Sequence, residues 1–120
     1  MIKKVLIVED ELIIQIVNIQ VIEEAGYEVC AAVTNGEDAI IAVRKFNPDL
    51  ILMDIKLEGV IDGIDAMQQI RLFSKVPVIY ITGNSDSYHL KRAKETGMND
   101  FLIKPVEFEV MIKAINKVFA

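Results

Sequence analysis

Acidic, hydroxyl and cationic side chains follow four apolar stretches of this sequence, at the point where each stretch ends. Glu9 and Asp10 come after the first stretch, and Asp54 directly follows the run Leu-Ile-Leu-Met. Thr82 and Lys104 follow two later apolar stretches in the same way. A carboxylate at the end of a buried strand is costly unless another group stabilises it. If these side chains meet, the carboxylates share one site with an ammonium group and a hydroxyl.

Such a site suits phosphoryl transfer. The carboxylates of Glu9, Asp10 and Asp54 repel one another when crowded, and a divalent cation relieves that repulsion. Only oxygen ligands are on offer, which favours Mg²⁺ over zinc or copper. With Mg²⁺, Lys104 and Thr82 holding the equatorial oxygens of the transferring group, Asp54 is the candidate nucleophile. The product is an acyl phosphate on Asp54.

Each of these residues also has a purely structural interpretation. The acids at 9–11 suit the N-terminus of a helix, where negative charge is stabilising. Asp54 alone is compatible with a turn cap, and Thr82 alone with a turn. Lys104 alone is compatible with a solvated charge. The combination favours a site, because complementary groups fall at strand ends in one consistent topology.

Short apolar runs rich in β-branched residues alternate with longer segments of helical character. We expect β-strands over Val5–Val8, Val29–Val33, Leu50–Met53, Val78–Ile81 and Phe101–Ile103, and helices over Leu12–Ala25, Glu37–Phe46, Ile64–Phe73, Tyr88–Thr96 and Glu107–Phe119. Gly26 and Gly97 follow two of the helices, where a left-handed residue is favoured, and Asn47-Pro48 closes another. This alternation predicts an α/β fold with a parallel sheet covered on both faces. Ligands of such sheets bind beyond the carboxyl ends of the strands.

Composition narrows the class of protein further. The 120 residues, 52% of them hydrophobic, suit a single domain over residues 1–120 with one core. No apolar run reaches membrane-spanning length, and the N-terminus lacks the pattern of a signal peptide. The net charge of −5 disfavours polyanions such as DNA. The lone Cys30 excludes an internal disulfide, and we expect a reduced thiol in a cytoplasmic setting.

The segments VLIVEDE, DLILMDIKLEGVIDGIDA, PVIYITG and GMNDFLIKP resemble the receiver domain of two-component response regulators, the CheY-like family. The resemblance extends from about Lys3 to Val118, so we expect no DNA-binding or other output domain in this chain. It implies a flavodoxin-like (βα)5 three-layer sandwich with strand order 2-1-3-4-5. It also implies a phosphoprotein switch in a phosphorelay, not an enzyme.

The resemblance implies specific roles around the metal. Asp54 matches the phosphoacceptor, and Asp10 matches the acid that ligates Mg²⁺ directly. Glu9 matches its partner, which usually acts through water and is more often an aspartate. Lys56 is expected to offer its backbone carbonyl to the metal.

The resemblance also implies a switch. Thr82 matches the hydroxyl that turns toward the phosphoryl group, and Lys104 matches the family's lysine, with a cis bond to Pro105. Phe101 takes the place of the switch aromatic, but it lacks a tyrosine hydroxyl, so switching must work through burial of the ring. Asn84, two residues after Thr82, is a candidate to hold the water that hydrolyses the phosphate.

The implied partner is a histidine kinase or a histidine phosphotransfer protein, and the downstream target is unknown. The segment LIIQIVNIQVI, residues 12–22, is apolar nearly all round. It is either a deeply packed helix or a docking surface for the donor's helical bundle, with Ile14 and Val21 as candidate outward residues.

Three other functions compete with this hypothesis, and the sequence argues against two of them. One is a receiver-like module that binds partners without phosphorylation. An aspartate-dependent phosphatase would need a second aspartate two residues after the nucleophile, where this chain has Lys56. A flavin or nucleotide carrier would need a phosphate-binding loop after the first strand, where acidic residues stand instead.

Overall fold

The protein is an α/β sandwich around one parallel sheet, described by a computed structural model over residues 1–83 and 86–120. The strands are β1 (Lys4–Val8), β2 (Glu28–Val33), β3 (Leu50–Met53), β4 (Val78–Thr82) and β5 (Asp100–Ile103). Their order in the sheet is β2-β1-β3-β4-β5, and all four pairings are parallel. The predicted flavodoxin-like fold and strand order are therefore confirmed.

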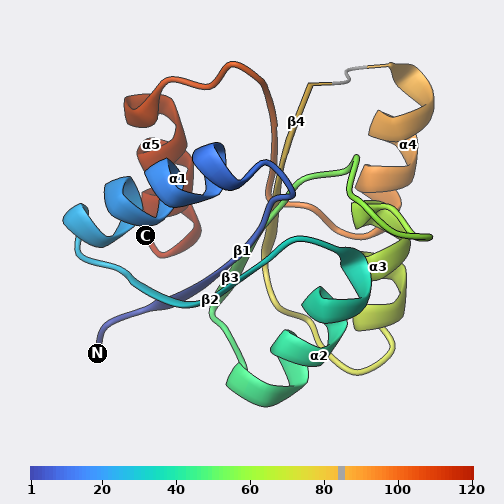
Figure 1. Cartoon of the computed structure of the whole chain (residues 1–120), viewed down its shortest axis with the longest axis horizontal. Helices are drawn as coiled ribbons and strands as arrows, with labels where there is room; N and C mark the ends of the chain where they lie inside the picture. Colours follow the sequence, from blue (N-terminus) through green and yellow to red (C-terminus); the bar gives the residue numbers. More distant parts are fainter. Residues whose placement is uncertain (84–85) are drawn as a thin grey trace.

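Helices alternate with the strands along the whole chain. They are α1 (Leu12–Glu24), α2 (Gly36–Phe46), α3 (Gly63–Ile70), α4 (Ser87–Glu95) and α5 (Phe108–Val118). Figure 1 shows α1 and α5 on one face of the sheet and α2, α3 and α4 on the other. The carboxyl ends of the strands consequently share one edge between the two helical layers.

The central strands are buried on both faces, as their continuous apolar sequences predict. Successive side chains point to opposite sides of the sheet. In β3, Ile51 and Met53 pack into the core beneath α2, α3 and α4, whereas Leu50 and Leu52 pack beneath α1 and α5. This two-sided burial holds β3 rigidly up to its last residue, immediately before Asp54.

Local sequence signals set most element boundaries. Asn35 caps α2 by accepting a hydrogen bond from the Asp38 amide at 2.8 Å. Gly26 and Gly97 adopt the left-handed conformation that was expected after their helices, and Asn47, which ends α2, adopts it as well.

Most predicted helix boundaries differ from the structure by no more than one residue, and the largest difference is three residues. The third helix ends at Ile70, not at Phe73. Its last turn tightens, because the amides of Leu72 and Phe73 donate to Gln69 and Ile70, three residues back. The side chain of Arg71 then bonds carbonyls beyond the helix, and these bonds fix the chain in a turn.

Within the described residues, no helix has the length and apolar character needed to cross a membrane.

Candidate functional site

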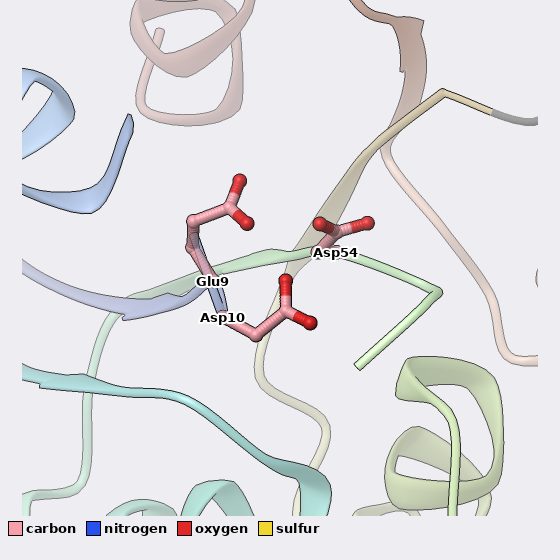
Figure 2. A group of neighbouring side chains, drawn as sticks. All are labelled: Glu9, Asp10 and Asp54. Atoms are coloured by element: carbon pink, nitrogen blue, oxygen red, sulfur yellow. The ribbon is translucent and has the colours of Figure 1, made fainter. Parts of the chain in front are cut away.

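Three carboxylates converge at the carboxyl edge of the sheet. The ligand oxygens of Glu9, Asp10 and Asp54 all lie within 4.8 Å of one another, and Figure 2 shows the three side chains turned toward the same space. They converge because β1 and β3 are neighbours with Val8 paired to Met53, and the Asp54 amide donates to the Val8 carbonyl at 3.0 Å. The predicted acidic cluster is thus present in the structure.

Lys104 joins this cluster from β5. Its Nζ lies 2.7 Å from Oε1 of Glu9 and 2.8 Å from Oδ2 of Asp54. Its backbone amide donates to the Thr82 carbonyl at 2.9 Å, which fixes the start of the lysine beside the end of β4. The bond to Pro105 is cis, as the family resemblance implied. One cation therefore bridges two carboxylates that are far apart in the sequence.

The electrostatics of the site leave it short of positive charge. Burial raises the pKa of Glu9, and the nearby carboxylate of Asp54 adds to this rise, although Lys104 opposes it. Burial also raises the pKa of Asp10, helped by its neighbour Glu9. Burial alone would lower the pKa of Lys104, but its hydrogen bonds to Asp54 and Glu9 raise it above the ordinary value. One ammonium thus faces three carboxyl groups.

The donor set fits Mg²⁺. The cluster offers carboxylate oxygens from two rigid strand ends, and hard divalent cations prefer such ligands. Glu9 and Asp54 are almost fully buried, so their charges are poorly screened by solvent and gain most from a cation. Lys56 lies just beyond Asp54 with an exposed side chain, which is compatible with a role for its backbone carbonyl alone.

The two predicted switch residues lie on the neighbouring strands. Thr82 is buried as the last residue of β4, in register with Ile103 of β5. The ring of Phe101 is half-buried and tilted against the ring of Tyr80, with 6.2 Å between their centroids. Asn84, the candidate for holding water, falls outside the described residues.

Two further residues contact the site, and one of them, Gln15, was not singled out from the sequence. The buried amide of Gln15 on α1 donates from Nε2 to the carbonyls of Glu9 and Val33, each at 3.1 Å. Gly63 lies so close to Asp54 that a Cβ added to it would stand 2.0 Å from the Asp54 carbonyl oxygen. The available signals were an uncharged polar residue inside the apolar run LIIQIV and a glycine opening a helix.

The outward residues of the first helix were predicted only in part, since Ile14 does line an apolar hollow beside this helix. Gln15 and Ile22 face the sheet, and the candidates Ile14 and Val21 lie half-buried on the flanks of α1. The exposed apolar residues of this helix are instead Leu12, Ile13 and Ile16, which are 59%, 80% and 62% accessible. The apolar pattern alone gave no direction, because a helix that is apolar all round has no distinguishable inner face.

Comparisons with known proteins agree with this fold and site. Residues 5–116 match the family model described as the response regulator receiver domain. The chemotaxis protein CheY of Thermotoga maritima is 32% identical over 117 residues, which are 97% of each chain. The transcriptional regulatory protein PdtaR of Mycobacterium tuberculosis is 33% identical over 94% of this chain, which spans only 55% of that relative.

Solved structures give the same result. The signal receiver domain of a modulated diguanylate cyclase from Desulfovibrio desulfuricans superposes with a TM-score of 0.90 at 30% identity, covering 98% of this chain and 94% of that one. The CheX–CheY–BeF3–Mg²⁺ complex of Borrelia burgdorferi gives a TM-score of 0.91 at 25% identity, with coverage of 98% and 90%. The chain belongs to the receiver domain family of two-component response regulators. It is therefore a signalling domain and not an enzyme, and its acidic cluster is consistent with the family's phosphoacceptor site.

Proposed function

We propose that Asp54 accepts a phosphoryl group from the phosphohistidine of a kinase or phosphotransfer protein, with Mg²⁺ bound beside it. The observation that carries this proposal is the contact of Lys104 with Asp54 and Glu9 at the edge of the acidic cluster. A structural ion pair would need one acid, whereas this lysine binds two carboxylates next to a third. Such excess negative charge on a rigid strand edge suits a metal and a reacting phosphoryl group.

The residues of the site then have separate tasks. A carboxylate oxygen of Asp54 forms the new bond to phosphorus, the phosphorus–nitrogen bond to the donor histidine breaks, and its electron pair leaves with the imidazole. Lys104 already lies 2.8 Å from Asp54, so its ammonium is placed to hold a phosphoryl oxygen. Glu9, Asp10, Asp54 and the Lys56 carbonyl would hold Mg²⁺, which supplies charge neutralisation when bound.

Phosphorylation is proposed to alter the face formed by α4, β5 and α5. Thr82, the last residue of β4, would turn its hydroxyl toward the phosphoryl group. The ring of Phe101 is half-buried, so it has room to change its burial as that face changes. The Borrelia CheX–CheY–BeF3–Mg²⁺ complex supports a Mg²⁺-dependent site on this fold. We also expect that the protein is cytoplasmic and that residues 1–120 form one receiver domain.

The test is phosphorylation by a small phosphodonor with Mg²⁺, followed by intact mass measurement. The wild-type protein should gain the mass of one phosphoryl group, and Asp54→Asn should gain none. Removing Mg²⁺ with a chelator should abolish the gain. Equal labelling of Asp54→Asn would place the acceptor elsewhere. If the wild-type protein stays unlabelled by both a small donor and a phosphohistidine donor, the alternative of a phosphorylation-independent binding module replaces this proposal.

The exposed side of α1 is the proposed docking surface for the donor. Ile13 and Phe108 border an apolar hollow of about 420 Å³ between α1 and the start of α5, and Lys104 lines the same hollow. Because Lys104 also contacts Asp54, a helical bundle seated there would present its phosphohistidine close to the acceptor.

Charge introduced on this surface should therefore weaken transfer. We expect Ile13→Glu to slow phosphotransfer from a histidine donor while labelling by a small phosphodonor is unchanged. The matched control is Ile41→Glu on α2, which alters another exposed isoleucine on the other face of the sheet (Figure 1). Docking on α1 is excluded if both variants transfer at the wild-type rate.

A further inference from the structure

Arg92 connects the last turn of α4 to the start of α3. Its Nη1 lies 2.9 Å from Oδ2 of Asp62, and its Nη2 lies 2.7 Å from Oδ1 of Asp65. The three side chains are partly buried, and these hydrogen bonds raise the pKa of Arg92 above its ordinary value. The planar guanidinium bonds two carboxylates in a fixed geometry that a lysine lacks. We call this group, Arg92 with Asp62 and Asp65, the arginine clasp.

The clasp holds the residues that begin α3. Asp62 is the N-cap of this helix and accepts from the Asp65 amide at 2.7 Å, while Asp65 accepts from the Asp62 amide at 3.0 Å. This reciprocal capping box makes Asp62 and Asp65 a single rigid unit. A displacement of Arg92 would therefore also displace the first turn of α3.

That first turn rests on the backbone of the phosphoacceptor. The Gly63 amide donates to the Ile55 carbonyl at 2.7 Å. Gly63 also packs so tightly on the Asp54 carbonyl that no larger residue fits between them. Gly63 and the Asp54 carbonyl cannot move closer together, since their backbone atoms are already close-packed. Asp54 is thus linked to α4 through Gly63, Asp62 and Arg92.

Apolar burial contributes little to holding α4 in the part of the chain that the structure describes. Ala93 is the one buried residue of this helix, Leu90 is half-buried, and most of the other side chains are polar. Its C-terminal end is held separately, where Arg71 donates from Nε to the Thr96 carbonyl at 2.7 Å. Among the described residues, the clasp is therefore the main polar connection between α4 and the segment that follows Asp54.

We propose that Arg92 is a positioning residue for the phosphoacceptor site, coupling α4 to the segment between Asp54 and Gly63. This inference rests on the proposed Mg²⁺-dependent function, because that segment contains Lys56, whose carbonyl would bind the metal. Coupling between two sites is reciprocal. A partner that moves α4 changes the affinity of the site for Mg²⁺ through Arg92, and Mg²⁺ in turn changes the position of α4.

The test is a Mg²⁺ titration of the isotopically labelled protein, followed by the backbone amide signals. Arg92→Gln is compared with Lys91→Gln, which removes the same charge from the exposed neighbouring position on α4. In the wild-type protein and in Lys91→Gln, Mg²⁺ should shift the signals of Glu9 and Asp10 and also those of α4. In Arg92→Gln, Mg²⁺ should no longer shift the amide signals of α4. The affinity for Mg²⁺ should fall by a factor of about three or more.

Two further variants complete the experiment. Arg92→Lys, which keeps the charge without the two-pronged geometry, should recover part of the Mg²⁺ affinity. If Arg92→Gln fails to fold, Asp65→Asn is the substitute. It weakens the clasp but leaves the sequence of α4 unchanged and keeps the Asp65 backbone amide that donates to Asp62. The same two readouts then apply. The proposal is overturned if the variants bind Mg²⁺ and shift α4 as Lys91→Gln does. Failure of wild-type protein to bind Mg²⁺ would instead refute the proposed function.

Discussion

Helices α1 and α4 lie on opposite faces of the sheet and are held there by different forces (Figure 1). Helix α1 is apolar nearly all round and fully buries Ile22 in the core that it shares with α5. Helix α4 is mostly polar and buries only Ala93 among its own residues. Arginines 71 and 92 supply the hydrogen bonds and ion pairs that attach α4 to α3 and its flanking turn.

The difference indicates which helix is suited to move. Burial of apolar surface is roughly proportional to contact area and resists any shift that opens a gap. A few charged contacts at the surface contribute less and are exchanged more easily with water. We therefore interpret α1 as the fixed platform of this domain and α4 as the element whose position responds to the site.

Each helix nevertheless reaches the site through one polar side chain. Gln15 of α1 bonds the backbone of Glu9, and Arg92 of α4 bonds Asp62, next to the glycine that packs on Asp54. The carboxylate cluster is thus braced from both faces of the sheet. Three experiments test this contrast between the two helices.

The largest expected effect comes from the apolar contacts of α1. Ile22→Ala should lower the free energy of unfolding by about 3 kcal/mol, because it leaves a cavity in a fully buried position. Leu90→Ala, at a half-buried position of α4, should lower it by only about 1 kcal/mol. Urea denaturation measures both. Equal losses would mean that the two helices are held alike.

A smaller effect is expected from the polar contact of α1. Gln15→Leu should cost about 1.5 kcal/mol of stability, since the Glu9 and Val33 carbonyls lose a buried donor. Mg²⁺ affinity should fall as well, because the end of β1 is no longer held. The control is Gln20→Leu on the exposed side of α1. If the two variants have the same Mg²⁺ affinity, Gln15 only stabilises the fold.

The smallest effect is expected at the clasp and depends on pH. Burial alone raises the pKa of Asp62, but hydrogen bonds from Arg92 and the Asp65 amide bring it below the ordinary value. A carboxyl group with a lowered pKa stabilises the fold fully above the pKa of the unfolded chain, about 4 for aspartate. That contribution is lost as the pH falls through the lower pKa of the folded protein.

Asp62→Asn isolates this contribution, because asparagine remains a good N-cap. At neutral pH the variant should be less stable than wild type by up to about 1 kcal/mol. The difference should shrink as the pH falls below about 4 and Asp62 takes up its proton. Denaturation series at several pH values measure the difference. A gap that stays constant into strong acid would show that the charge of Asp62 contributes nothing.

Much of the fold and site was predictable because its determinants are local. Continuous apolar runs, turn residues and helix-ending glycines indicate strands, turns and helix ends without any information from distant parts of the chain. The parallel topology then brings the carboxyl ends of the strands to one edge, which was enough to predict that Glu9, Asp10, Asp54 and Lys104 meet. The sequence by itself therefore determined the sheet, its alternating helices and the composition of the acidic cluster.

The inner face of α1 and the contacts between helices were decided only by the tertiary structure. An apolar helix has no preferred side until the sheet and α5 pack against it, so the sequence did not show that Ile13 and Ile16 are more exposed than Ile14 and Val21. Arg92 reads in the sequence as an ordinary surface charge of a polar helix. It reaches Asp62, 30 residues away, only because α3 and α4 lie on the same face of the folded sheet (Figure 1). Pairing of side chains between two helices depends on how the helices pack, which no local sequence pattern encodes.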